Sequence, residues 1–172
     1  MYQANVCTSG NYRLILNTTA ALDTGNNPFG GVVPTSSVFT MNQTFYARSG
    51  DNIVAYCFTP VAGYSAFGSY TGNGSTDGPF VFTGMRPRFI MWKRTDTTSG
   101  WSMHDTSRDP YNISTNNLFA DSSGAEDTGD SIIDLLSNGF KLRNTYARAN
   151  ASGGTYIYAA FAESPFKNSL AR

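Results

Sequence analysis

The sequence has few charges, only two cysteines and a single histidine, and each shortage argues against a class of function. Charged residues make up 14% of the chain, whereas average soluble domains have roughly a quarter. The 12 basic and 12 acidic residues cancel at pH 7, and no basic stretch is longer than Lys93-Arg94. The sequence therefore lacks the cationic footprint of a nucleic-acid-binding protein. One histidine and two distant cysteines also cannot supply the ligands of a tetrahedral zinc site.

Long apolar runs are lacking as well. Apolar runs such as Phe89–Trp92 are far shorter than the ~20 residues of a membrane-spanning helix. The N-terminus has neither the basic start nor the apolar core of a secretory signal, so we expect neither a membrane partner nor Sec export. Cys57 lies within the apolar run Ile53–Phe58, which favours a small buried thiol, although the sequence leaves a disulfide with Cys7 open.

Aromatic residues and turn formers are abundant. Aromatics make up 14% of the chain, with ten Tyr and twelve Phe, and 17 Gly accompany many Ser, Thr and Asn. This composition fits β-strands joined by many turns and does not fit a disordered chain. The apolar runs are short and show almost no helical periodicity. The sequence therefore predicts an all-β protein.

Seven apolar runs are predicted to be strands. Residues 88–94 are apolar on both faces, as in a central strand of a sandwich, whereas residues 101–104 alternate as in a half-buried strand. Residues 132–136 also suit one turn of helix. The predicted strands are Ile53–Phe58, Phe80–Phe82, Arg88–Arg94, Trp101–His104, Ile132–Leu136, Phe140–Arg143 and Tyr156–Ala162.

Short polar segments predict how these strands connect. Thr95–Gly100 is short enough to make a hairpin of the runs on either side. Asn138-Gly139 predicts a second hairpin with a type I′ turn, because both central residues of that turn need positive φ. Asn17–Gly31 and Asp121–Gly129 are predicted to be exposed loops.

The chain also repeats itself unevenly. Three stretches recur in the same order: residues 14–25 with 118–129 at an offset of 104, Ser36 and Phe39 with Ser137 and Phe140 at 101, and residues 49–58 with 152–161 at 103. Duplicated β-units would give this pattern. Residues 68–109 have no upstream counterpart, because the chain begins too late to contain one. We therefore expect a complete β-sandwich unit in residues 68–172, preceded in residues 1–67 by the back part of another, or the two fused in one compact domain.

No residue pattern predicts catalysis. His104 precedes Asp105 on a strand, where neighbouring side chains point to opposite faces, so a surface histidine is expected. No Gly-x-Ser-x-Gly element positions a nucleophile. Gly72–Pro79 lacks the Lys of a phosphate-binding loop and is followed by β-runs, which predicts a wide turn. Glu126 and Glu163 are the only glutamates, and nothing in the sequence places two carboxylates across a cleft.

Two binding sites were considered on composition alone. An acidic region could wrap a calcium ion but lacks EF-hand spacing; its residues are Asp121, Glu126, Asp127, Asp130 and Asp134. Four aromatic residues could form a sugar-stacking platform, although most aromatics are needed for the core; these are Tyr64, Tyr70, Trp101 and Tyr111. We therefore assign no catalytic, cofactor-binding or metal-binding residue and expect a protein that is not an enzyme.

Several long strings resemble a repeat domain of uncharacterised function that occurs in tail-fibre and other structural proteins of bacteriophages. The resemblance is close from about residue 53 to 172, and residues 12–52 resemble the tail of a preceding repeat. The strings that carry it are 62–74 (AGYSAFGSYTGNG), 78–80, 84–87, 92–96 (WKRTD), 105–112 (DTSRDPYN), 136–143 (LSNGFKLR) and 150–166 (NASGGTYIYAAFAESPF).

The resemblance implies a concanavalin-like or jelly-roll β-sandwich and a non-enzymatic virion protein, assembled in the host cytoplasm. A tail-fibre or adhesin module would assemble with copies of itself and other virion proteins, and would contact a host-surface glycan. The alternatives are a capsid-decoration protein and a carbohydrate-binding module. The resemblance carries over no catalytic or metal-binding residue.

Overall fold

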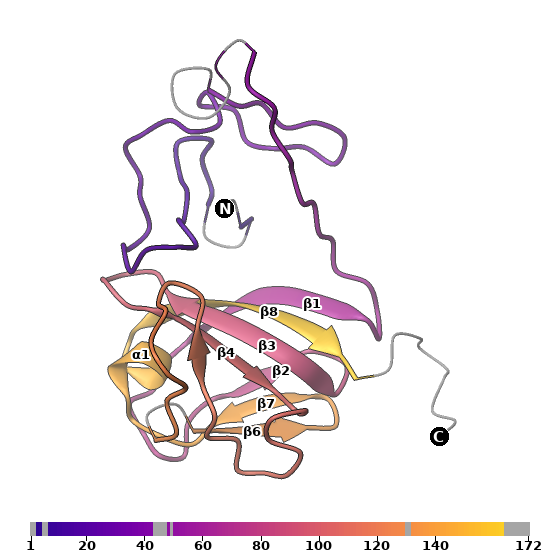
Figure 1. The fold of residues 1–172 in the computed structure, drawn as a ribbon, viewed down its shortest axis with the longest axis vertical. Coiled ribbons are helices and arrows are strands. Elements are labelled where there is room, and N and C mark those ends of the chain that lie inside the picture. Colours follow the sequence, from indigo (N-terminus) through magenta and orange to yellow (C-terminus); the bar gives the residue numbers. More distant parts are fainter. Residues whose placement is uncertain (1–2, 5–6, 43–47, 49, 130–131, 164–172) are drawn as a thin grey trace.

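The structure is a computed structural model that describes residues 3–4, 7–42, 48, 50–129 and 132–163. Two antiparallel sheets face each other, which confirms the predicted all-β sandwich (Figure 1). The elements are β1 (Ser65–Thr71), β2 (Phe80–Phe82), β3 (Pro87–Arg94), β4 (Trp101–Asp105), β5 (Leu118–Phe119), β6 (Ile133–Leu136), β7 (Gly139–Leu142), α1 (Ala147–Asn150) and β8 (Thr155–Ala162).

The larger sheet has five strands in the order β1-β8-β3-β4-β5, and the smaller has three in the order β2-β7-β6. β3 and β8 lie side by side in the larger sheet, with Met91 opposite Ala159. Each also pairs on its other side, β3 with β4 and β8 with β1. Residues 156–160 of β8 are all buried, so both faces of that strand are packed, which fits the apolar runs 89–92 and 156–162.

The main core fills the space between the two sheets. It contains Trp92, Phe140 and Tyr156, all fully buried. Tyr70 stacks on Tyr156 with 4.8 Å between ring centroids and 7° between planes, and Phe140 meets Tyr70 edge-on at 5.9 Å. Aromatic burial of this kind dominates the energetics of a small sandwich.

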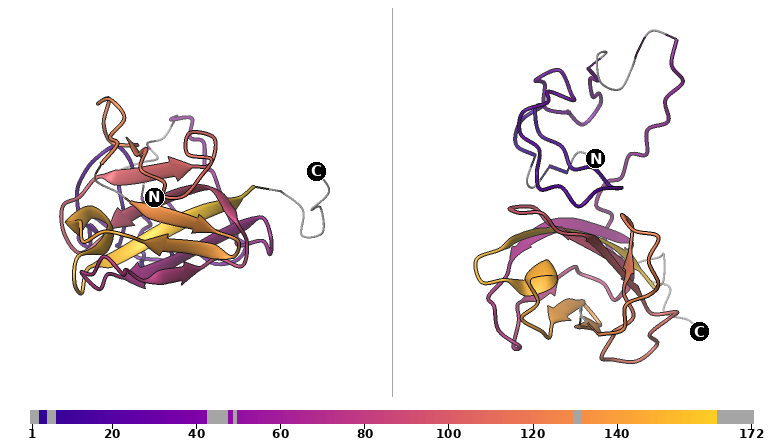
Figure 2. Two further views of the ribbon diagram at one scale, coloured as in Figure 1. Left: turned by 90° about the horizontal axis from the view of Figure 1, so that it is seen from below. Right: turned by 60° about the vertical axis from the view of Figure 1, so that its left-hand side comes forward.

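The N-terminal segment, residues 9–32, lies on the side of the larger sheet away from the smaller sheet and packs on its outer face near the β3–β4 turn (Figure 2). Leu14 is fully buried there against Trp101 and Ile157. The indole Nε1 of Trp101 donates to the Ile15 carbonyl at 3.0 Å. Lys93, also fully buried, donates to carbonyls of the segment and of the β3–β4 turn. This end of the larger sheet is therefore packed on both faces.

The β6–β7 hairpin was predicted correctly, but its turn type was not. Leu136 pairs with Gly139, so the two-residue loop is Ser137-Asn138 rather than Asn138-Gly139. Neither loop residue has positive φ, so the turn is not type I′. Gly139 is needed instead for space, because a Cβ there would lie 2.2 Å from the Val81 carbonyl oxygen.

The run Ile53–Phe58 was predicted to be a strand and is not one. Residues 51–60 are exposed and pair with no strand of the described chain, although the matching residues 156–161 form the middle of β8. The segment runs between the N-terminal part and the start of β1 (Figure 1). Its composition suits a strand, but a strand also needs a neighbour for its backbone hydrogen bonds, and none is present here.

The loops that match in sequence share backbone hydrogen bonds at matching positions. Arg13 and Asp23 exchange two of them, as do Asn117 and Asp127, 104 residues later. In both loops the aspartate side chain then accepts from the backbone N–H two residues on, at 3.1 Å. Isolated bridges between Gly10 and Gly31 and between Ser114 and Ile133 frame the two loops. The local folding of residues 9–32 thus parallels that of the described residues 113–129 and 132–134.

Candidate functional site

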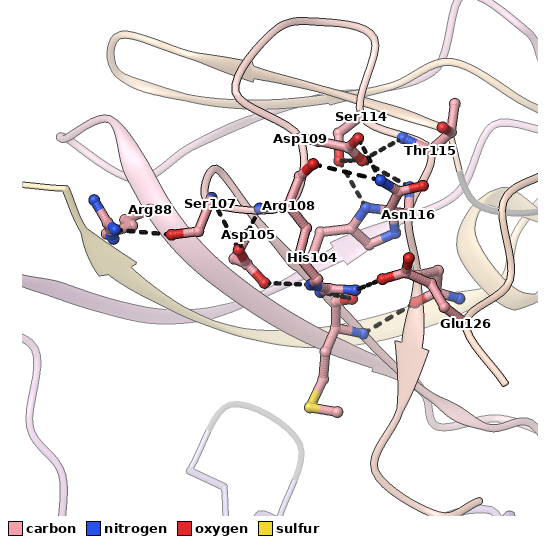
Figure 3. Close-up of polar contacts among 12 residues, drawn as sticks. Arg88, His104, Asp105, Ser107, Arg108, Asp109, Ser114, Thr115, Asn116 and Glu126 are labelled. Atoms are coloured by element: carbon pink, nitrogen blue, oxygen red, sulfur yellow. Dashed lines mark hydrogen bonds and ion pairs between the residues drawn. The ribbon is translucent and has the colours of Figure 1, made fainter. Parts of the chain in front are cut away.

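His104 lies at the centre of a buried polar network beneath the loop that follows β4 (Figure 3). The ring stacks on Trp92, with 5.0 Å between centroids, so the expected surface position is wrong. His104 Nδ1 is 2.9 Å from Ser114 Oγ, and that hydroxyl donates to Asp109 Oδ2 at 2.9 Å. Because the Ser114 proton goes to Asp109, the imidazole donates from Nδ1. This is not the nucleophile–base arrangement of a serine hydrolase.

Burial lowers the pKa of His104 to about 4, with a smaller contribution from the nearby Arg108 guanidinium. Asp109 and Asp105 act in the opposite direction and do not compensate. The imidazole is therefore neutral at pH 7, and its Nε2 is buried without a hydrogen bond. A neutral, enclosed ring of this kind braces the loop between Trp92 and Ser114.

Asp109 and Asn112 fix the shape of the loop after β4. The Asp109 carboxylate accepts four hydrogen bonds, from Ser114 Oγ, from Asn116 Nδ2 and from the backbone N–H groups of Thr115 and Asn116. The Asn112 side chain pairs with the backbone of Leu135 in β6, donating at 3.0 Å and accepting at 2.9 Å. The tip of the loop, Pro110-Tyr111, therefore lies between two residues that are held in place, Asp109 and Asn112.

Asp105 is held by Arg108 rather than by its neighbour His104. Arg108 Nε donates to Asp105 Oδ2 at 2.6 Å, and Nη1 donates to Glu126 at 2.5 Å. Burial raises the pKa of Asp105, but the hydrogen bonds from Arg108 and Ser107 outweigh it, so the pKa lies below its usual value. The arginine thus ties the β4 end to the loop that carries Glu126, which is a structural role.

An open cavity of about 490 Å³ lies beside this network at the start of β3. Arg88 is exposed there and donates from Nη2 to Ser107 Oγ at 2.8 Å (Figure 3). Arg86 lies 3.5 Å from the Glu163 carboxylate. The cavity is lined by Arg86, Arg88, Thr106, Ser107, Pro110, Tyr111 and Glu163. Among the described residues, this is where exposed cations, hydroxyls and an aromatic ring come together.

The four aromatic residues considered for sugar stacking do not form one platform. Trp101 is 1% exposed and Tyr70 is buried in the main core. Tyr64 packs edge-on against Phe161 at 6.3 Å. Tyr111 is 84% exposed and lines the cavity. Only Tyr111 is therefore both free to stack and placed beside charged groups.

The acidic region does not gather into a cation site in the described part of the chain. Asp121 accepts from the Trp101 backbone N–H, Glu126 pairs with Arg108, and Asp134 pairs with Arg143. Asp127 lies 3.9 Å from Arg148, and Asp130 falls outside the described residues. Within that described part, no three His, Cys, Asp or Glu side chains are grouped to hold a metal ion.

Three further sequence expectations concern loops and thiols. Residues 72–79 connect β1 to β2, so the wide turn followed by a strand is confirmed. Glu126 and Glu163 belong to different contacts, with Arg108 and Arg86 respectively. Cys57 is exposed and Cys7 is buried, and both are free thiols, so the expectation of a buried Cys57 is wrong.

Sequence reasoning missed the two arginines of the cavity. Their signal is the tripeptide Arg86-Pro87-Arg88, in which a rigid residue separates two cations. The pattern of residues 88–94 predicts a strand from its apolar residues, and a charge at its start indicates only where that strand begins. The arginines become part of a site only in the folded chain, because the loop after β4 lines the same cavity.

Fold and cavity together define an all-β sandwich whose N-terminal segment packs on one end of the larger sheet, with an open cationic cavity at the start of β3. The chain belongs to the family described as a domain of unknown function, DUF7483, whose model matches residues 1–165. The match includes both the N-terminal part and the sandwich. No curated protein and no solved structure matches the chain. Among the described residues, no helix has the length and apolar character to cross a membrane.

Proposed function

We propose that this chain is a non-enzymatic structural module of a bacteriophage virion, a tail-fibre or adhesin unit that assembles with copies of itself. The resemblance of residues 53–172 to repeat domains of phage structural proteins supports this role. A zero net charge supports it too, because closely packed copies would not repel one another.

The observation that carries the proposal is the exposed apolar segment Ile53–Phe58. Val54 and Tyr56 are 75% and 82% exposed, and Phe58 is also largely exposed. Isolated apolar residues on a surface are ordinary, but a consecutive apolar run is typical of a surface that is covered in an assembly. By sequence the run matches β8, which has a strand on both sides. We infer that the run acquires strand neighbours when copies associate.

The outer edge of β1 in a second copy is the partner that we propose for this run. β1 ends the five-stranded sheet and pairs only with β8 among the described strands. Ala162 N–H donates to the Tyr64 carbonyl, so alternate residues of β1 face β8. Ser69 and Thr71 have the other parity and direct their backbone groups outward. An added strand would bond to these groups, as in other cases of β-augmentation.

Sedimentation of purified protein tests this assembly. We expect the wild type to form oligomers, and Tyr56→Asp to weaken association at least tenfold, because it places a charge in the proposed strand pairing. Tyr111→Asp is the matched control, since Tyr111 is equally exposed but lies on another loop. A wild type that stays monomeric at high concentration, or two variants that weaken association equally, would contradict the proposal.

The place in the particle is tested on purified virions. Quantitative mass spectrometry is expected to find this chain in the particle at a few copies per tail. Hundreds of copies would instead indicate a capsid-decoration protein. Particles that infect normally and contain none of this chain would refute a virion role.

A further inference from the structure

The cavity at the start of β3 has one cation more than it has anions. Two guanidinium groups and one carboxylate line it, those of Arg86, Arg88 and Glu163. Arg86 is partly neutralised by Glu163 at 3.5 Å. Among the described residues Arg88 forms no ion pair, and its one side-chain hydrogen bond is to the neutral Ser107 hydroxyl. A guanidinium has five N–H donors in a planar fork, so Arg88 keeps donors for a planar anion such as a carboxylate.

A β-bulge places Arg88 in the cavity. Pro87 is opposite Ala162 and Phe89 is opposite Phe161, so Arg88 is an extra residue in the ladder between β3 and β8. Its carbonyl still accepts from the Thr106 N–H, which keeps it joined to the loop after β4. Bulges commonly re-aim one side chain out of a sheet. Here the bulge turns a cation outward beside the hydroxyls of that loop.

Tyr111 gives the cavity an aromatic wall on an anchored stretch of backbone. Its ring is 84% exposed. The backbone on either side is held, because Asp109 accepts four hydrogen bonds within the loop and Asn112 pairs with Leu135. Pro110 has a fixed φ, which adds to the rigidity of this backbone. The freedom that Tyr111 loses when a ligand stacks on its ring is therefore mainly that of its side-chain torsions.

We propose that this cavity binds an acidic saccharide, with the sugar carboxylate on Arg88 and the sugar ring against Tyr111. The hydroxyls of Thr106 and Ser107 lie within the same lining and would meet sugar hydroxyls. The volume of about 490 Å³ is in the range of small-ligand sites. A nucleic acid is disfavoured, because one excess cation gives little release of counterions. The inference rests on the proposed function, for which it names the class of host-surface ligand.

Calorimetric titration with sodium glucuronate tests the site, with glucose and sodium acetate as the comparison probes. We expect glucuronate to bind at least tenfold more tightly than glucose, which lacks the carboxylate, and than acetate, which lacks the ring. Arg88→Gln is expected to weaken glucuronate binding at least tenfold, and Tyr111→Ala severalfold. The matched controls are Arg48→Gln and Phe82→Ala, since both residues are exposed, neither lines the cavity and neither belongs to the run Ile53–Phe58.

Each outcome of the glucuronate titration either supports or refutes the proposed site. Absence of glucuronate binding, equal binding of acetate or glucose, or equal losses in the control variants overturns the inference. Sedimentation of the same variants separates this result from the proposed assembly. Loss of glucuronate binding in Arg88→Gln with unchanged oligomers supports the site. Oligomers that form normally in a wild type that binds no glucuronate leave the assembly standing and refute the site alone.

Discussion

At the scale of single residues, His104 shows that an alternating pattern does not predict an exposed residue where both faces of the strand are packed. The alternation in residues 101–104 correctly predicts a strand. A strand with one open face would leave His104 in water, but the N-terminal segment covers the Trp101 face while Ser102 and His104 face the interior. Nothing local in the sequence shows that both faces are covered, so burial of the histidine was not predictable from it.

The buried histidine makes stability depend on pH. In the folded state the pKa of His104 is about 4, whereas an unfolded histidine has a pKa of roughly 6.5. Between these values the unfolded chain binds an extra proton, so the free energy of unfolding falls as the pH is lowered through this window. The total loss is about 3 kcal/mol. Urea unfolding at a series of pH values from 7.5 to 5 measures most of it.

Two further measurements test this prediction. In His104→Gln the slope of the free energy of unfolding against pH is expected to flatten between pH 6.5 and 5, because the carboxylates titrate at lower pH. The chain contains one histidine, so its imidazole proton signals in NMR spectra belong to His104 without further assignment. Titration of those signals near pH 6.5 would show that the ring is exposed.

At the scale of elements, apolar runs predict strands well where a neighbour exists. Phe80–Phe82 is β2 as predicted, and residues 88–94 and 156–162 lie within β3 and β8. β1 was not predicted as a strand, because its Ser, Ala and Gly residues have low β-propensity. The structure supplies the reason for these small residues, since a Cβ on Gly68 would lie 2.7 Å from the Tyr158 ring. Ile53–Phe58 is the opposite case, because its composition is typical of a strand but no described strand pairs with it.

The β6–β7 hairpin offers a test of close approach between strands. Gly139→Ala is expected to destabilise the protein by about 2 kcal/mol or more, because the new Cβ would meet the Val81 carbonyl oxygen at 2.2 Å. Gly25→Ala is the control, as no atom lies within 4 Å of its Cβ position. Its effect should stay within about 0.5 kcal/mol. Thermal unfolding of both variants measures the difference, and equal effects would show that β2 and β7 are not packed this closely.

At the scale of the whole molecule, the N-terminal segment is part of the packed structure. The sequence predicted a partial unit in residues 1–67 and a complete one in residues 68–172. Contacts such as Trp101 Nε1 with the Ile15 carbonyl join residues far apart in the chain, and no repeat pattern could have indicated them. The cavity likewise combines the start of β3, the loop after β4 and Glu163. The sequence contains each of these segments, but it does not show that they lie together in the fold.

Leu14 tests how strongly the segment is attached. It is fully buried against Trp101 and Ile157, so Leu14→Ala is expected to lower the free energy of unfolding by about 2–5 kcal/mol. Leu16→Ala is the matched control, because Leu16 is largely exposed only two residues away. Tryptophan fluorescence during urea unfolding reports the change through Trp101. Equal stabilities of the two variants would mean that the segment is not docked on the sheet.

The unequal exposure of the two thiols has a practical use. Burial raises the pKa of Cys7, and its side chain is fully enclosed, so it should react slowly with maleimides. Cys57 is exposed within residues 53–58. The natural chain therefore accepts a single fluorescent dye at the run that we propose to be covered in assemblies. Shielding of that dye as the protein concentration rises would follow copy-to-copy pairing directly, with no engineered residue.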